Sequence, residues 1–178
     1  MTTHLALLRG INVSGHKMIK MDFLKKALET IGFTNVRTYI NSGNIFVNAD
    51  EDSAKVGFLI KQEIFKTFGH DVPVFMITAA DLKFALNNNP FYATDEETKQ
   101  LYVCFLSEKP TTNCIQELKD QKFKDDVFEV KETILFLKYA DSAANTKLDN
   151  KIIEKKLKVA STTRNWNTVN KLNEMFGE

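Results

Sequence analysis

Three segments of the chain are rich in arginine, asparagine, serine, threonine and glycine, which bind anions through guanidinium, amide and backbone N–H groups. They are residues 7–13 with the basic loop that follows, residues 36–44, and residues 162–169. Few residues typical of covalent chemistry occur in them. We therefore expect one polar, basic ligand-binding pocket, formed by Arg9, Gly10, Asn12, Lys17, Arg37, Asn41, Ser42, Asn44, Thr163, Arg164, Asn165 and Asn167.

The first segment resembles a phosphate-binding P-loop in its context but not in its details. Gly10 and Gly15 are separated by four residues between an expected strand and an expected helix. His16 stands where the P-loop lysine belongs, and Met18 offers no hydroxyl group for Mg²⁺. These departures argue against nucleotide hydrolysis. Two interpretations stay open: anion binding by the loop N–H groups with the neighbouring basic side chains, or a tight glycine turn with solvated basic residues.

The second segment predicts a hairpin turn at residues 41–44, because Asn and Gly tolerate positive φ. The conformation of a hairpin turn alone can explain why Asn, Ser and Gly occur here, without any ligand. The functional alternative is that Asn41 and Asn44 project from the strand end beside the first loop. In the strand before the turn, Arg37 and Tyr39 alternate with their neighbours, so both should point to one face of the sheet.

The third segment precedes a predicted helix, with Thr163 or Asn165 as its N-cap. Arg164 at the helix start would oppose the macrodipole unless an anion sits there. Such a position suits a phosphate or carboxylate ligand. Trp166 could stack a base, but apolar residues three and six positions later favour a role in the core.

The usual catalytic and metal-binding patterns are missing from the sequence. The three histidines are scattered, and neither a His/Cys metal spacing nor a G-x-S-x-G elbow occurs. Cys104 and Cys114 are too few for a disulfide scaffold and lack C-x-x-C spacing, so we expect buried thiols in a reducing cytosol. We predict no metal, no cofactor and no disulfide partner.

Composition indicates a globular protein without a strong bulk charge. The 178 residues are 43% apolar with a net charge of +1, and no apolar run approaches the ~20 residues needed to cross a bilayer. The N-terminus lacks a basic n-region, which predicts a cytoplasmic protein. Residues 1–49 carry six Lys/Arg against two Asp/Glu and residues 139–178 carry seven against five, so a local positive field is expected if these two ends meet in the fold. We expect the 14 phenylalanines to fill the core.

Apolar periodicity predicts strands at 5–8, 36–40, 45–47 and 72–77 and helices at 23–31 and 56–68, the β-α-β-β-α-β order of a ferredoxin-like fold. A further helix should start at the cap Thr78, with Asp81 in the capping box. A similar order begins with a strand at residue 101, continues with a helix at about 112–119 and ends in helices near 149–156 and 165–176. We predict an α+β fold of two ferredoxin-like (α/β-plait) subdomains, 1–78 and 79–178, packed as one unit with C-terminal helices.

An internal echo suggests that the two subdomains are a duplication. Leu28 and Phe33, followed by the apolar strand 45–47, recur in order as Leu118, Phe123 and 134–136.

The three polar segments together resemble the signature segments of the family called domain of unknown function 1697. The resemblance runs from near residue 4 to near residue 172, with Ser14 where the family typically has a second glycine. It implies a bacterial cytosolic protein with two ferredoxin-like subdomains and supplies no reaction.

Three classes of function stay open. The leading hypothesis is a binding module for a phosphate- or carboxylate-bearing small molecule or an RNA backbone. The second is an enzyme that uses the same arginines to stabilise negative charge, with His16 as the nearby general acid or base. The third is an interaction or structural protein in which the polar segments lock the two halves together.

Overall fold

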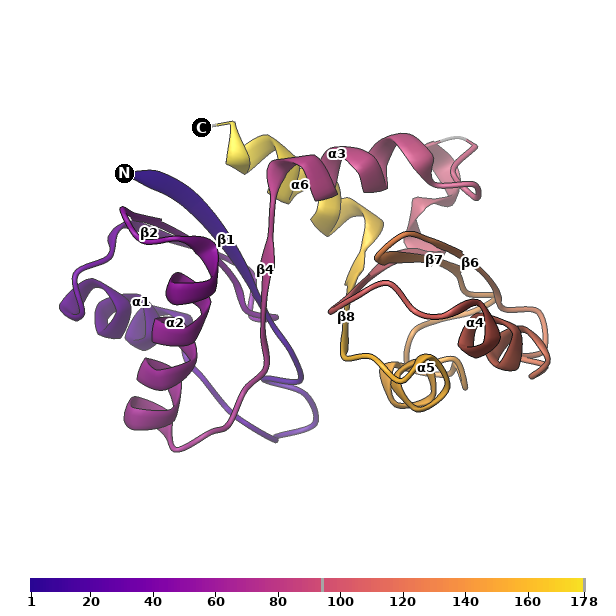
Figure 1. The fold of residues 1–178 in the computed structure, drawn as a ribbon, viewed down its shortest axis with the longest axis horizontal. Coiled ribbons are helices and arrows are strands. Elements are labelled where there is room, and N and C mark those ends of the chain that lie inside the picture. Colours follow the sequence, from indigo (N-terminus) through magenta and orange to yellow (C-terminus); the bar gives the residue numbers. More distant parts are fainter. Residues whose placement is uncertain (94, 178) are drawn as a thin grey trace. The chain divides into compact units, whose positions relative to one another are not determined.

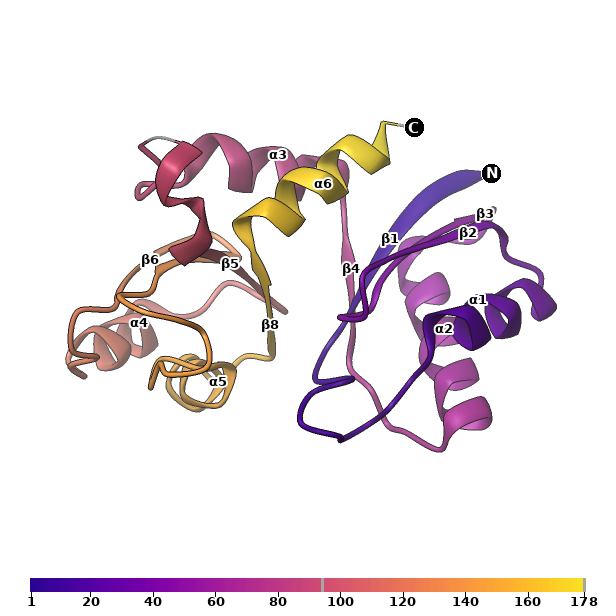
Figure 2. The same cartoon turned by 180° about the vertical axis from the view of Figure 1, so that it is seen from behind.

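The computed structural model describes residues 1–93 and 95–177, and the side chains of all of these except 95–97. The chain divides into two compact units. The first unit contains Met1–Asp81 and Met175–Glu178, and the second contains Leu82–Glu174. Each unit has a four-stranded antiparallel sheet with two helices on one of its faces (Figures 1 and 2). The α+β class is confirmed.

In the first unit the strand β1 lies in the interior of the sheet, between β3 and β4, in the order β2-β3-β1-β4. Leu5 pairs with Phe46 on one side and with Ile77 on the other. The helices α1 and α2 bury Leu24 and Ile60 against the sheet. The elements are β1 (Thr2–Leu8), α1 (Met21–Thr30), β2 (Thr34–Tyr39), β3 (Asn44–Ala49), α2 (Ser53–Phe68), β4 (Val74–Ile77) and the start of α3 (Ala79–Asn88).

The second unit repeats this arrangement, with β5 between β7 and β8 and the order β6-β7-β5-β8. The helices α4 and α5 bury Leu118 and Ile153 against its sheet. Its elements after α3 are the 3₁₀ helix η1 (Asp95–Gln100), β5 (Leu101–Leu106), α4 (Thr112–Lys119), β6 (Val127–Lys131), β7 (Ile134–Lys138), α5 (Asn150–Leu157), β8 (Ser161–Asn165) and α6 (Trp166–Phe176).

The strand β8 corrects the expected context of Arg164. Arg164 does not lie at a helix start: it pairs with Val103 of β5, and the last helix begins at Trp166. The five residues of β8 read Ser-Thr-Thr-Arg-Asn. They show no apolar alternation, so the ladder with β5 defines this strand rather than a local pattern.

Three phenylalanines correct the expectation that this residue type fills the core. Phe23 on α1 is 59% exposed, and Phe58 and Phe65 on α2 are 52% and 60% exposed. Burial of each helix requires only one apolar stripe, and these rings lie outside it. These three phenylalanine rings are therefore exposed on the surface of the first unit instead of packing in its core.

The start of α3 has the predicted capping box. The Thr78 Oγ1 accepts from the Asp81 N–H at 3.1 Å, and the Asp81 Oδ2 accepts from the Thr78 N–H at 2.8 Å. We expect Thr78→Ala to lower the free energy of unfolding by about 1 kcal/mol in urea titrations. Thr112→Ala is the matched control, because Thr112 follows the true cap Thr111 of α4. Equal losses in the two variants would contradict a contribution from the capping box.

Among the described residues, none of the helices has the length and apolar character needed to cross a bilayer.

Candidate functional site

The loop after β1 is a folded turn. Val13 and His16 form an isolated β-bridge, in which the His16 N–H donates to the Val13 carbonyl at 2.9 Å. Between them Ser14 and Gly15 adopt φ of 50° and 77°. These values place both residues of the turn in the left-handed region, as tight two-residue hairpin turns require. His16 therefore stands at an exposed tip.

Asn12 ties this loop together and fastens it to the β2–β3 hairpin. Its Oδ1 accepts from the Ile19 N–H at 2.8 Å, and its Nδ2 donates to the Ile19 carbonyl at 2.9 Å. The same Nδ2 donates to the Asn41 carbonyl at 2.8 Å. The side-chain amide thus uses both donor hydrogens on backbone carbonyls. Asn12 itself adopts a left-handed φ of 54°, and its side chain stabilises the loop through these three hydrogen bonds.

The hairpin turn itself packs closely on the end of β1. The Leu8 N–H donates to the Gly43 carbonyl at 2.8 Å. Asn44 is completely buried, and its Nδ2 donates to the Tyr39 carbonyl at 2.9 Å and to the Ser42 hydroxyl at 3.0 Å. Asn44 and the half-buried Ser42 therefore hold the turn, whereas Asn41 is exposed.

Two cations, Arg9 and Lys17, lie at this end of the sheet, whereas Arg37 lies midway along β2. The Arg9 N–H donates to the Pro73 carbonyl at 3.1 Å, which joins the start of the loop to the entry of β4. The Lys17 ammonium donates to the Asp71 carbonyl. The Arg37 guanidinium lies 5.1 Å from the centre of the Phe46 ring, its partner across the β2–β3 ladder.

The predicted alternation of β2 is confirmed by the ladder register. Arg37 pairs with Phe46 and Tyr39 pairs with Asn44, so the two side chains share one face. Gly10, with φ of 69°, begins the loop.

The third predicted segment lies in the second unit. Arg164 is 7% exposed, and its Nη1 donates to the Thr162 hydroxyl and the Thr163 carbonyl, both at 3.0 Å. Burial lowers the pKa of the Arg164 guanidinium to about 10, because desolvation disfavours the charged form. The Thr163 hydroxyl donates to the Asn150 Oδ1 at 2.6 Å, which fastens β8 to the first turn of α5.

Asn165 is the N-cap of α6, as one of the two alternatives predicted. Its Oδ1 accepts from the Asn167 N–H at 2.9 Å, while the Asn167 side chain is exposed. Trp166 is 3% exposed and packs 5.1 Å from Tyr92, ring centre to ring centre. The prediction of a core role for Trp166 is confirmed.

The structure brings two of the three predicted segments together. Residues 9–17 and 37–44 meet at one end of the first sheet, joined through Asn12 and Gly43. Residues 162–167 belong to the second unit, so a single pocket from all three segments stays a prediction.

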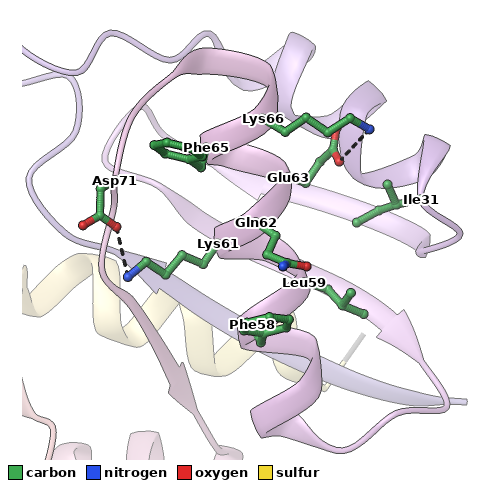
Figure 3. Close-up of a pocket in the computed structure, with 9 residues that line it drawn as sticks. All are labelled: Ile31, Phe58, Leu59, Lys61, Gln62, Glu63, Phe65, Lys66 and Asp71. Carbon is green, nitrogen blue, oxygen red and sulfur yellow. Dashed lines mark ion pairs between the residues drawn. The ribbon is translucent and has the colours of Figure 1, made fainter.

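A groove on α2 was missed by sequence reasoning. It has a volume of about 790 Å³ and lies on the outer face of the helix, with Ile31 from the end of α1 at its border (Figure 3). The Lys61 ammonium lies 3.0 Å from the Asp71 carboxylate, and the Lys66 ammonium lies 3.7 Å from that of Glu63. One feature of the sequence could have indicated this groove. Phe58 and Phe65 are seven residues apart on the helix and lie outside the apolar stripe of Val56, Ile60 and Ile64.

Potential metal ligands are not clustered in the part of the chain that the structure describes. There, no three or more His, Cys, Asp or Glu side chains come close enough to hold an ion.

Comparisons with known proteins place the chain in a family. The solved structure of a conserved bacterial protein, SP0830 from Streptococcus pneumoniae, is similar with a TM-score of 0.71 and 25% identity, covering 100% of this chain and 99% of that one. None of the curated proteins compared with the chain matches it. The family model "Protein of unknown function (DUF1697)" matches residues 1–136, which include the first two polar segments and end before the third. The chain therefore belongs to the DUF1697 family of proteins of unknown function.

Proposed function

We propose that this protein is a binding module that holds a phosphate- or carboxylate-bearing ligand, a small molecule or an RNA backbone, at the loop end of the first sheet. One observation carries the proposal. The loop of residues 9–20 and the hairpin of residues 34–49, which Asn12 joins, contain four Lys/Arg and no Asp/Glu. Their cations are Arg9, Lys17, Lys20 and Arg37.

Charge and rigidity both support an anionic ligand. Cations on two joined segments that contain no acidic residues of their own contribute a positive potential that attracts negative charge. The three hydrogen bonds of Asn12 hold the loop in one conformation before any ligand arrives. Less conformational entropy is then lost on binding, which favours affinity. The same bonds stabilise the folded loop, so they have a structural role beside the proposed one.

The proposal includes a ferredoxin-like duplication with subdomains at 1–78 and 79–178. Its support is the equivalent strand order of the two sheets, each with the first strand of the unit in the interior. Leu28 and Leu118 are both completely buried near the ends of α1 and α4. Phe33 and Phe123, which follow those helices, are each 5% exposed.

We also propose a bacterial, cytoplasmic protein. Cys104 and Cys114 are free and buried, which suits a reducing compartment. The similar solved structure is described as a conserved bacterial protein.

The proposal predicts ligand-dependent stabilisation that two loop lysines control. We expect a phosphate- or carboxylate-bearing compound, at ~100 times its Kd, to add about 2.7 kcal/mol of stability and raise the thermal midpoint by several degrees. The panel contains nucleotides, sugar phosphates, carboxylates and short RNAs. Lys17→Gln combined with Lys20→Gln should abolish most of the shift, because it removes two of the four cations while leaving the clamp of Asn12 intact.

The matched control is Lys119→Gln combined with Lys122→Gln, two exposed lysines at the same spacing in the second unit. This pair should keep the full thermal shift. A flat panel for the unmodified protein, or equal loss in the two double variants, would overturn the proposed anion site.

A further inference from the structure

Ile40 is a strained residue in the turn between β2 and β3. Its φ is 50°, in the left-handed region that L-residues rarely adopt. A branched Cβ makes this conformation still less favourable, so Gly, Asn or Asp is the usual residue there. Hydrogen bonds fix the turn on both sides of Ile40: Asn44 donates to the Tyr39 carbonyl at 2.9 Å, and Asn12 donates to the Asn41 carbonyl at 2.8 Å. The fold therefore imposes a left-handed conformation on an isoleucine.

The Ile40 side chain contributes little to the folding of the unit. It is 50% exposed, so half of its apolar surface stays in water. An asparagine at this position would keep the turn, relieve the strain and lose little burial. A residue that costs stability and leaves apolar surface in water is better explained by contact with a ligand than by packing of the core.

Two further apolar side chains are exposed on the loop that is joined to this turn. Val13 and Met18 are each 60% exposed. Val13 follows Asn12 in the chain, and Met18 and Ile40 each precede a residue whose backbone is bonded to the Asn12 amide. The three apolar side chains therefore belong to the two segments that Asn12 holds together. Grouped apolar surface of this kind commonly marks a binding site.

Two lysines of the same loop supply positive charge. The Lys17 ammonium donates to the Asp71 carbonyl, a neutral acceptor. Lys20 is exposed, and its ammonium lies 6.0 Å from the centre of the Phe23 ring. Neither ammonium forms an ion pair with a described carboxylate, and the Asp71 carboxylate pairs with Lys61 at 3.0 Å. Both lysines therefore keep their charge available for an anion.

We propose that the ligand at this end of the sheet is an amphiphilic anion, a phosphate or carboxylate attached to an apolar group of several carbon atoms. Lys17 and Lys20 attract the anion, and Ile40 with its two apolar neighbours contacts the apolar group. This inference rests on the proposed anion site and narrows its ligand class. Burial of the apolar group adds affinity, whereas the hydroxyl groups of a sugar phosphate or an RNA backbone would lose hydrogen bonds to water against these side chains.

The test compares three soluble phosphate monoesters by isothermal titration calorimetry with the full chain. They are methyl phosphate, hexyl phosphate and ribose 5-phosphate. We expect hexyl phosphate to bind at least about tenfold more tightly than methyl phosphate, because its longer chain can be buried. Ribose 5-phosphate should bind no more tightly than methyl phosphate. Lys17→Gln combined with Lys20→Gln should weaken all three.

Ile40→Asn separates the apolar contact from the anion site. This variant should bind hexyl phosphate at least about fivefold more weakly and methyl phosphate with unchanged affinity. Its thermal midpoint should rise by about 2–4 °C, because the strain is relieved. Val127→Asn is the matched control, a β-branched residue of β6 that is 44% exposed, and should bind hexyl phosphate normally. Val13→Ser combined with Met18→Ser tests the other apolar residues and should weaken hexyl phosphate alone.

The possible failures can be told apart. Equal affinity for hexyl and methyl phosphate would overturn the amphiphilic ligand and leave the anion site standing. The absence of binding to all three monoesters would overturn both this inference and the phosphate ligand on which it rests. Unchanged hexyl phosphate binding in Ile40→Asn would show that the strained residue has no role in the site. Sedimentation with phosphatidylglycerol vesicles, without a preference for hexyl phosphate, would assign the surface to a membrane instead.

Discussion

Replacing Gly43 with alanine is expected to lower the free energy of unfolding by about 2 to 5 kcal/mol. Gly43 has φ of 77°, in the region that L-residues rarely adopt. A Cβ atom there would lie 2.6 Å from the Leu8 Cβ and 2.8 Å from the Ile11 Cδ1. Leu8 cannot retreat easily, because its N–H donates to the Gly43 carbonyl and its side chain is completely buried. Urea titration followed by far-UV circular dichroism measures the loss.

Gly15→Ala separates backbone strain from the close contact. Gly15 also has φ of 77°, but an added Cβ would meet no atom within 4 Å. Its substitution should therefore cost only the strain of a left-handed alanine, about 1 kcal/mol. If the two variants lose the same stability, the Leu8 and Ile11 side chains can move away from an added Cβ at Gly43 at little cost, and the close contact does not destabilise the protein.

The elements that sequence reasoning predicted well are those with a local signal. α4 spans Thr112–Lys119 as its periodicity indicates, with the Thr111 hydroxyl accepting the Cys114 N–H at its start. α2 ends at Gly69 in the left-handed conformation, as the glycine position predicts. β8 has no such signal, because its stability depends on hydrogen bonds to β5, about 60 residues earlier in the chain.

The candidate site divides in the same way. That the first loop and the hairpin lie together could be expected from their positions at strand ends, but the role of Asn12 could not. Its three bonds join residues 7 and 29 positions away, and no spacing rule encodes such contacts. The groove on α2 depends on which face of the helix stays uncovered by the rest of the fold. Composition does not contain this information, so we expected Phe58 and Phe65 in the core although both are exposed.

Asn12→Asp should lower the free energy of unfolding by about 2 to 4 kcal/mol, although the two side chains have the same shape. The carboxylate keeps the acceptor for the Ile19 N–H and loses both donor hydrogens. Two carbonyl oxygens, of Ile19 and Asn41, would then face a negatively charged oxygen at the 2.9 and 2.8 Å distances of the present hydrogen bonds. Both repulsion and unsatisfied acceptors act against the folded loop. Urea titration at neutral pH measures the change.

Asn35→Asp is the matched control, since Asn35 is exposed and has φ of 47°, close to the 54° of Asn12. It places the same carboxylate at a left-handed position without the three bonds, so its cost should stay within about 0.5 kcal/mol. Lowering the pH below the usual range of an aspartate pKa should restore part of the stability of Asn12→Asp, because a protonated carboxyl can donate again to one of the two carbonyls. Equal losses in the two variants, or no recovery on acidification relative to the control, would mean that the loop is held by its turn geometry and the packing of Ile19 rather than by the Asn12 amide.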